Sequence, residues 1–443
     1  MIKVGIVSLG CPRNLVDSEI ILGSLKKEGF YLSDEVGSGV DVFIINTCSF
    51  VKSAREESID TILEAAQLKK EGKIKYLVVA GCLPQAHGKK LLKSLPEVDS
   101  LVGTSDFAKI GSIVRSMVAG RARSIISKTP DYLYDEKSPR FTLTPRHFAY
   151  VKISEGCDNL CSYCIISRLR GRFRSRTIES VIKEVKDISA PGRLKEIDII
   201  GQDTTLFGAD MYGKSKFPRL LKDMAALKNS VEWMRILYTH PAHYTDEFIQ
   251  TVRDEPKICK YLDLPIQHIS DKILKKMNRR VTKKEVVGLI ENIRKNIPGI
   301  ALRTSVIVGF PGETEKDFME LLEFLKATRF EKLGAFIYSR EDLSPAAKFK
   351  GQVPEEVKKE RFDRIMKAQQ DVSAEVNRSF IGKRLKVLID EELEGGRYFG
   401  RTEYDAPEVD GGVYVSGKGL MIGNFYEVKI VDTLEYDLVG QVT

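Results

Sequence analysis

The sequence predicts a multidomain α/β protein with three parts: an N-terminal parallel α/β sheet, a central partial (β/α)6 barrel of TIM-like type, and a small antiparallel C-terminal β-barrel. Three observations predict this fold class. Apolar runs in the first third each stop at a cysteine, further apolar runs in the middle each precede a helical stretch, and short runs near the end are separated by glycines. At 443 residues the chain is also too long for one ordinary hydrophobic core.

The apolar runs of the first third end at Cys11, Cys48 and Cys82, which we call the strand-end cysteines. Helix-like stretches at 17–28 and 53–70 separate them, so the order is β-α-β-α-β with parallel strands. The carboxyl ends of such strands meet at one edge of a sheet, where α/β proteins bind ligands. One cysteine there would be interpreted as a small buried residue. Three of them predict a three-thiol metal site.

A second set of cysteines, Cys157, Cys161 and Cys164, forms a C-x3-C-x2-C motif; we call these the loop cysteines. Three thiolates can hold a [4Fe-4S] cluster while one iron stays open for another ligand. The alternatives are three incidental cysteines or a structural zinc site. It usually needs a fourth Cys or His at set spacing, and the nearest histidines, His147 and His240, do not provide one.

The middle of the chain contains six apolar runs, too few for the eight units of a closed barrel, so an opening on one side is expected. They lie at residues 150–153, 196–203, 233–238, 261–265, 301–309 and 332–338. Polar residues in or just after these runs are candidate substrate contacts: Gln202, Asp203, His240, Gln267, His268, Arg303 and Ser305. For His240 and His268, a structural and a functional role fit the sequence equally well.

A polar stretch with prolines at 130, 139 and 145 is interpreted as a linker. An amphipathic pattern over 354–380 predicts a long helix. Short strands at 384–389, 412–416 and 425–431, separated by glycine turns, predict the C-terminal barrel. The predicted domains are 1–130, 146–373 and 374–443, with 131–145 as the linker.

The net charge of +8 is unevenly distributed. Residues 381–443 hold seven basic and twelve acidic residues, a net charge of −5, so the rest of the chain carries +13. An acidic module is not expected to clamp nucleic acid, which requires side chains that neutralise phosphates.

The first residues form a strand pattern without the features of a signal peptide, and no apolar run approaches the roughly 20 residues of a membrane helix. The sequence therefore predicts a cytoplasmic protein without a membrane partner. In that compartment, seven cysteines are more often metal ligands than disulfides.

Over essentially its whole length the chain resembles the radical S-adenosylmethionine (SAM) methylthiotransferases. The loop cysteines, with Tyr163 before the last of them, resemble a radical SAM cluster loop. The strand-end cysteines resemble the second cluster site of the family, and the C-terminal part resembles a TRAM domain. The resemblance to the members that modify a ribosomal protein rather than tRNA lies in residues 9–19, 201–205, 237–241, 264–270 and 405–410.

The resemblance implies methylthiolation of the β-carbon of an aspartate in the small-subunit ribosomal protein S-twelve. SAM would bind the open iron at the loop cysteines, and its reductive cleavage would give a 5′-deoxyadenosyl radical that abstracts hydrogen from that carbon. A second [4Fe-4S] cluster, on the strand-end cysteines, would hold the sulfur species, methylated by a second SAM. An unactivated C–H bond has no pKa that a general base could exploit, so cofactors must supply this chemistry.

The same resemblance implies further contacts and partners. Gln202, Asp203 and Arg303 are expected to hold the methionine end or ribose of SAM, and Tyr163 to lie near its adenine. An electron donor such as flavodoxin or ferredoxin and a source of sulfide or persulfide are required. The arginine-rich stretch 168–176 fits either contact with ribosomal RNA or a loop paired with carboxylates.

Two other functions remain open. The same clusters could methylthiolate an adenosine in tRNA, although an acidic C-terminal module favours a basic protein target over a polyanion. A non-catalytic iron–sulfur carrier would bind iron without cleaving SAM, and would leave the central β/α units unexplained.

Overall fold

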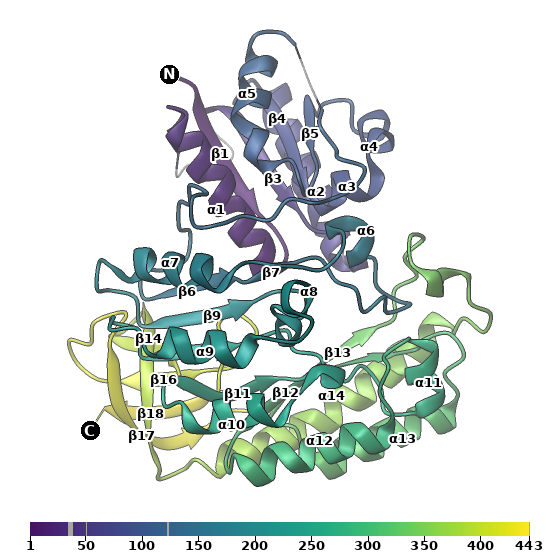
Figure 1. Cartoon of the computed structure of the whole chain (residues 1–443), viewed down its shortest axis with the longest axis vertical. Coiled ribbons are helices and arrows are strands. Elements are labelled where there is room, and N and C mark those ends of the chain that lie inside the picture. The colour runs from purple at the N-terminus through teal and green to yellow at the C-terminus, as the bar shows by residue number, and fades with distance from the viewer. Residues whose placement is uncertain (34–38, 50, 122–123, 443) are drawn as a thin grey trace.

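A computed structural model describes residues 1–33, 39–49, 51–121 and 124–442. Figure 1 shows the N-terminal sheet with its helices at the top, the central sheet and its helices across the middle, and the C-terminal barrel in yellow at the lower left. The predicted multidomain α/β fold class is confirmed. No helix in these ranges is long and apolar enough to cross a membrane.

The N-terminal sheet has five parallel strands in the order β2-β1-β3-β4-β5, and apolar clusters cover both of its faces. The strands are β1 (Lys3–Ser8), β2 (Tyr31–Leu32), β3 (Val40–Thr47), β4 (Ile74–Gly81) and β5 (Ser100–Val102). The helices are α1 (Pro12–Lys27), α2 (Lys52–Lys70), α3 (Cys82–His87), α4 (Lys89–Ser94) and α5 (Ile110–Val118). The predicted parallel sheet is confirmed, but β2 and β5 have only two and three residues, too few for a periodic signal.

The central sheet has six parallel strands in the order β13-β12-β11-β10-β9-β6, in agreement with the predicted incomplete barrel. They are β6 (Phe148–Lys152), β9 (Glu196–Ile200), β10 (Trp233–Ile236), β11 (Ile258–Asp263), β12 (Ala301–Val308) and β13 (Lys332–Ile337). The sheet is not closed: β6 and β13 are its two edges. A short hairpin, β7 (Ser154–Glu155) with β8 (Arg174–Ser175), follows β6.

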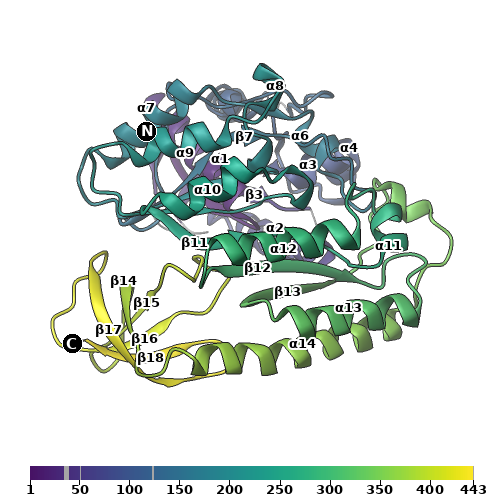
Figure 2. The same cartoon turned by 60° about the horizontal axis from the view of Figure 1, so that its bottom comes forward.

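Helices cover the outside of the central sheet, and the largest apolar cluster lies between them and the strands. The long ones are α7 (Ile178–Ser189), α9 (Phe217–Ala225), α10 (Asp246–Asp254), α12 (Lys283–Asn296), α13 (Glu315–Thr328) and α14 (Glu355–Arg378); α6 (Ile166–Arg170), α8 (Ala209–Tyr212) and α11 (Asp271–Lys276) are short. Figure 2 shows α14 running from the central sheet to the yellow barrel, as the amphipathic pattern predicts. The predicted domain boundaries stay a prediction.

The C-terminal part is a closed barrel in the order β14-β15-β16-β18-β17. The strands are β14 (Arg384–Leu393), β15 (Arg397–Arg401), β16 (Val413–Ser416), β17 (Phe425–Thr433) and β18 (Leu438–Val442). The predicted antiparallel barrel is confirmed, with one exception among its strand pairs: β16 and β18 pair in parallel. The sequence did not predict β15 and β18, in which Gly400 and Gly440 interrupt the strand pattern.

One loop of this barrel, residues 402–410, enters the incomplete central barrel; we call it the barrel loop. Asp405 pairs with Lys332 of β13 at 2.6 Å, and Glu408 accepts a hydrogen bond from the Tyr150 hydroxyl of β6 at 3.4 Å. Because β6 and β13 are the two edges of the sheet, the barrel loop bridges the gap between them.

Residues 131–145, the predicted linker, contain no helix or strand but pack against both α/β parts; we call them the strap. Tyr134 is buried, with its hydroxyl 3.2 Å from a carboxylate oxygen of Glu184. Arg140 pairs with Glu19 of α1 and Glu184 of α7, each at 2.6 Å. The strap therefore joins the N-terminal sheet to the central sheet through a buried cation.

Arg140→Met should destabilise the protein, because it leaves the buried carboxylate of Glu19 without its cation and removes one of the two arginines, Arg140 and Arg176, that pair with Glu184. We expect the free energy of unfolding to fall by about 3 kcal/mol or more, measured by urea denaturation. Lys137→Met, at an exposed position of the same strap, is the matched control and should cost less than about 0.5 kcal/mol. Similar losses in the two variants would contradict the role assigned to Arg140.

Candidate active site

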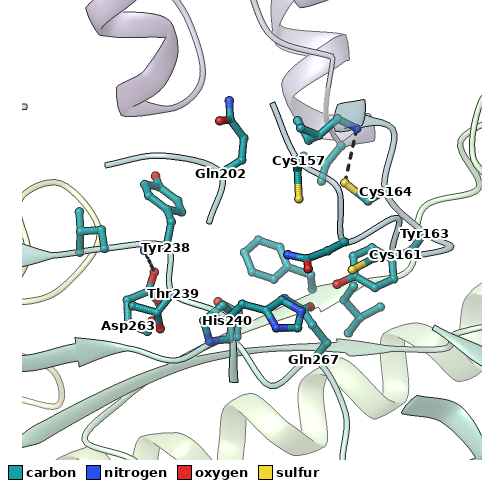
Figure 3. Close-up of a pocket in the computed structure, with 18 of the residues that line it drawn as sticks. Cys157, Cys161, Tyr163, Cys164, Gln202, Tyr238, Thr239, His240, Asp263 and Gln267 are labelled. Carbon is teal, nitrogen blue, oxygen red and sulfur yellow. Dashed lines mark hydrogen bonds between the residues drawn. The ribbon is translucent and has the colours of Figure 1, made fainter. Parts of the chain in front are cut away.

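A cavity of about 400 Å³ lies at the carboxyl ends of the central strands. All three parts of the chain line it: Arg13 comes from the N-terminal part, the loop cysteines from the central part and Val409 from the barrel loop. Figure 3 shows the loop cysteines on one side of this cavity, with His240 and Gln267 below them. The site is therefore composite.

The loop cysteines are held by contacts of the residues between them. The Ser162 backbone N–H donates to Met277 O at 3.0 Å and its hydroxyl to Lys276 O at 2.7 Å, which fixes the loop to the end of α11. Leu160 adopts a left-handed φ of 52°, and so turns the chain between the first two cysteines. All three cysteine side chains line the cavity.

The donor set fits a [4Fe-4S] cluster with an open iron. Three soft thiols border a cavity with space in front of them. Cys259, the one cysteine outside the two sets of three, is buried in another apolar cluster, so no fourth thiol of the described chain completes the site. Burial raises the pKa of Cys157 to about 11 and that of Cys164 to about 12. A bound cation is needed to keep these thiols ionised at neutral pH.

The strand-end cysteines lie at the tips of β1, β3 and β4, which are neighbours in the sheet. The Asn14 amide donates to Leu9 O at 3.0 Å and Thr47 O at 2.9 Å, and thereby ties the ends of β1 and β3 together. Gly10 has φ +88°, and a Cβ there would lie 2.6 Å from the Cys48 Cβ. Glycine is thus required where these strand ends approach each other.

Four buried charged residues, which we call the charge cluster, join the N-terminal part to the central part. The Lys152 ammonium lies 2.6 Å from both Asp17 of α1 and Glu155 of β7. Arg170 of α6 also pairs with Asp17, and lies 3.5 Å from Glu155. Burial opposes the ionisation of Glu155, but the two cations outweigh it and lower its pKa to about 2.

Arg170 also links the two cysteine sets. It belongs to the short helix α6, which begins two residues after Cys164. Its guanidinium donates to the Asn14 side-chain oxygen at 2.6 Å and lies 3.4 Å from the Cys82 sulfur. The element that follows the loop cysteines therefore contacts a strand-end cysteine directly.

Arg13 lies between the two sets. Its guanidinium donates to Gly201 O at 3.1 Å and stands 4.2 Å from the centre of the Tyr238 ring. Burial opposes ionisation of the Cys11 thiol, but the positive charge and hydrogen bond of Arg13 lower its pKa below the ordinary value. A residue of the N-terminal sheet domain thus faces both Cys11 and the cavity.

Three of the four predicted SAM contacts, Tyr163, Gln202 and Arg303, line the cavity. The Gln202 amide donates to Glu155, and its carbonyl oxygen has no hydrogen-bond partner in the described chain. Arg303 is 3.3 Å from both Asp263 and Asp410, so its charge is already shared with two carboxylates. These roles stay predictions.

Asp203, the fourth predicted contact, is buried and does not line the cavity. It accepts hydrogen bonds from Asn159 at 2.7 Å, His243 at 2.8 Å and the Thr205 hydroxyl at 2.5 Å. Asn159 belongs to the loop that carries the cysteines. The structure thus places Asp203 behind that loop, as a support.

The two histidines left open by the sequence differ in their surroundings. His240 lines the cavity, and its Nε2 atom has no partner in the described chain. Burial, assisted by the charge of Arg279, lowers its pKa to about 2, so the ring is neutral. His268 is buried, accepts from the Ser270 N–H at 3.0 Å and lies 3.5 Å from Glu313. A structural role explains His268.

Several residues of the wall were not predicted. Arg279 donates to Pro265 O and lies 3.7 Å from the Cys161 sulfur. Val409 arrives on the barrel loop. Of these residues, Arg13 could have been predicted from the sequence. It lies two residues after Cys11, and a cation beside a metal-binding thiol lowers the pKa of that thiol.

The arginine-rich stretch 168–176 is mostly paired within the protein. Arg170 and Arg176 are buried against carboxylates, and Arg174 donates to backbone carbonyls. Arg172 is exposed but pairs with Asp158 at 2.8 Å. These contacts favour the loop paired with carboxylates over a contact surface for ribosomal RNA.

Three family profiles match the chain. The radical SAM superfamily covers residues 151–325, uncharacterized protein family UPF0004 covers 3–103, and the TRAM domain covers 381–443. The cavity is thus bordered by residues from all three matched segments.

Curated relatives match almost the full length. The ribosomal protein uS12 methylthiotransferase RimO of Desulfitobacterium hafniense is 47% identical over 441 residues, 99% of this chain and 98% of that protein. The RimO proteins of Geotalea uraniireducens and Clostridioides difficile are 46% and 45% identical, over 99% and 100% of this chain and 98% and 99% of theirs. The chain belongs to the RimO family. It is therefore a radical SAM methylthiotransferase.

Solved structures agree with this assignment at the level of fold. The radical SAM methyltransferase TsrM of Kitasatospora setae, with tryptophan and a SAM analog bound, matches with a TM-score of 0.55 at 14% identity, over 75% of this chain and 72% of that one. Its structure with cobalamin and a [4Fe-4S] cluster gives 0.56 at 12% identity, over 86% and 76%.

The pKa differences predict selective thiol reactivity in the metal-free protein. At pH 8, Cys157 should be alkylated by iodoacetamide at least about tenfold more slowly than Cys11, because only the thiolate reacts. The Cys157 rate should rise about tenfold per pH unit toward pH 11. Mass spectrometry of timed anaerobic reactions measures both rates, and Cys157→Ser is the control for site assignment. Equal rates at pH 8 would contradict the assigned environments.

Proposed function

We propose that this chain transfers a methylthio group to the β-carbon of an aspartate in ribosomal protein uS12. One observation carries the proposal most directly: two sets of three cysteines lie on neighbouring elements, with Arg13 between Cys11 and the cavity that the loop cysteines line. Sulfur transfer to a carbon atom requires a radical source and a sulfur carrier within reach of one substrate atom.

The loop cysteines would hold one [4Fe-4S] cluster and the strand-end cysteines a second. When bound, the first cluster and SAM supply the radical that removes hydrogen, and the second supplies the sulfur species. Asp203 holds Asn159 and so keeps the cysteine loop in position. Neutral His240 is part of the cavity wall, its Nε2 atom has no partner in the described chain, and it would serve as a hydrogen-bond partner without adding charge.

The substrate assignment is supported by charge. Several acidic residues of the C-terminal barrel remain exposed, among them Glu391, Glu392, Glu394 and Glu408. A ribosomal protein is basic because it neutralises RNA phosphates, so it is attracted to this surface, whereas tRNA is repelled. We place the reaction in the cytoplasm, with a donor such as flavodoxin or ferredoxin and a sulfide or persulfide source.

Iron and sulfide analysis after anaerobic reconstitution tests the two cluster sites. The wild type should contain about eight irons per chain, and Cys157→Ala and Cys48→Ala about four each, because each variant loses one cubane. Cys259→Ala, which removes a thiol outside both sets, should keep about eight. A wild type with only about four irons would contradict the proposal.

Deletion of the gene tests the substrate. We expect uS12 to lose the mass of one methylthio group, and tRNA digests to keep their methylthiolated adenosines. Complementation with the wild type should restore the mass, and Cys48→Ala should not. The opposite pattern would assign the enzyme to tRNA, and no change in either would favour an iron–sulfur carrier.

A further inference from the structure

The two edges of the open central sheet are treated differently. At β6, side chains from outside the sheet form hydrogen bonds with the backbone of the edge. Three of them donate to carbonyl oxygens: Thr144 to Phe148 O at 2.8 Å, Arg140 to Tyr150 O at 2.6 Å and Arg176 to Lys152 O at 3.2 Å. The fourth, the Tyr134 hydroxyl, accepts a hydrogen bond from the Lys152 N–H at 3.1 Å. Three of these four side chains belong to the strap. Such capping prevents another chain from pairing with the edge.

The other edge, β13, ends the sheet, and no strand of the described chain pairs with its outer side. The Tyr338 N–H donates to Val308 O of β12 at 2.9 Å. Backbone groups alternate along a strand, so those of Leu333, Ala335 and Ile337 point away from β12. All six residues of β13 are at least partly exposed, whereas β6 and β9 are entirely buried.

The open edge is continuous with the cavity. Phe336 and Ile337 line it and are 44% and 37% exposed. The barrel loop, which pairs with Lys332 at the start of β13, adds Val409, 49% exposed, to the same wall. The barrel loop therefore fills the gap near the start of β13 and leaves the end of the strand accessible beside the cavity.

We propose that an extended segment of the protein substrate pairs with the outer edge of β13 and thereby places its aspartate in the cavity. The inference rests on the proposed function and specifies how the substrate is held. Free N–H and C=O groups that alternate along a strand are matched by another peptide backbone, not by a nucleic acid. In an added strand, alternate side chains point to one face, so one of them enters the cavity.

The side chains around this edge fit the same occupant. Phe336, Ile337 and Val409 provide apolar contacts for the residues next to the aspartate. Glu408 is exposed on the barrel loop, whereas Glu341, which also lines the cavity, is buried and already paired with Arg55. An exposed carboxylate beside apolar groups suits a segment of a basic protein, and a phosphate backbone would meet a like charge there.

Ala335 allows a test of the backbone contact. It does not line the cavity, and its N–H points to the open side, so proline there removes the donor without breaking a bond to β12. Ala335→Pro should weaken binding of uS12 to the cluster-loaded full chain by about tenfold. Ala335→Ser keeps the N–H and should bind within about twofold. Circular dichroism and thermal unfolding check both variants.

A second test leaves the enzyme unchanged. Synthetic peptides of about ten residues around the target aspartate are N-methylated at alternate backbone positions, in two complementary sets. Edge pairing uses every second N–H, so one set should lose about tenfold in affinity and the other little. Fluorescence anisotropy against the wild type measures both.

Equal effects of the two peptide sets, or no binding of the unmodified peptide, would overturn edge pairing even if Ala335→Pro fails to fold. If the wild type still methylthiolates intact uS12 in that case, the proposed function stands and only this inference fails. If the wild type does not modify uS12 at all, both fail.

Discussion

The relative position of the two cysteine sets depends on the charge cluster of Asp17, Lys152, Glu155 and Arg170. Two anions and two cations lie between the N-terminal and central parts, whose main apolar clusters are separate; a smaller apolar cluster shared by α1, β6 and the C-terminal barrel adds a non-polar contact. Burying any one of these charges alone would be costly in free energy, and that cost is offset only when all four side chains are close enough to pair. Such a contact allows one docking position and penalises small displacements. Because Arg170 also reaches Cys82, the docking position and the cluster sites are fixed by the same side chain.

Sequence patterns predicted those parts of the site that depend on local periodicity. The strand-end cysteines were placed correctly at neighbouring strand tips, because parallel strands share one carboxyl edge. The six central strands and α14 were predicted for the same kind of reason. Arg279, Val409 and the strap contacts arise where distant segments meet, and no spacing rule encodes them. Asp203 shows what a motif cannot predict: the residue is close to the site, yet it is buried and does not line the cavity.

The net charge of the C-terminal part could be interpreted only with the structure. The excess of acidic residues in the C-terminal part suggests a strongly negative surface, but some of these carboxylates are used internally. Asp405 pairs with Lys332, and Asp390 with Arg401. The arginine-rich stretch has the converse explanation, since its cations mostly neutralise neighbouring carboxylates or bind carbonyls. The surface field is therefore weaker and more local than the composition implies.

The barrel loop makes the C-terminal module part of the reaction chamber, not an appendage to it. A module that only recruited the substrate could be replaced by the corresponding module of a relative without any change to the cavity. Here an exchange would also replace one wall of the cavity, through Val409, and the partners of Lys332 and Tyr150 inside the sheet. Target choice and chamber shape are therefore coupled in this chain, and chimeras that splice a foreign barrel onto this catalytic core would inherit a mismatched interior.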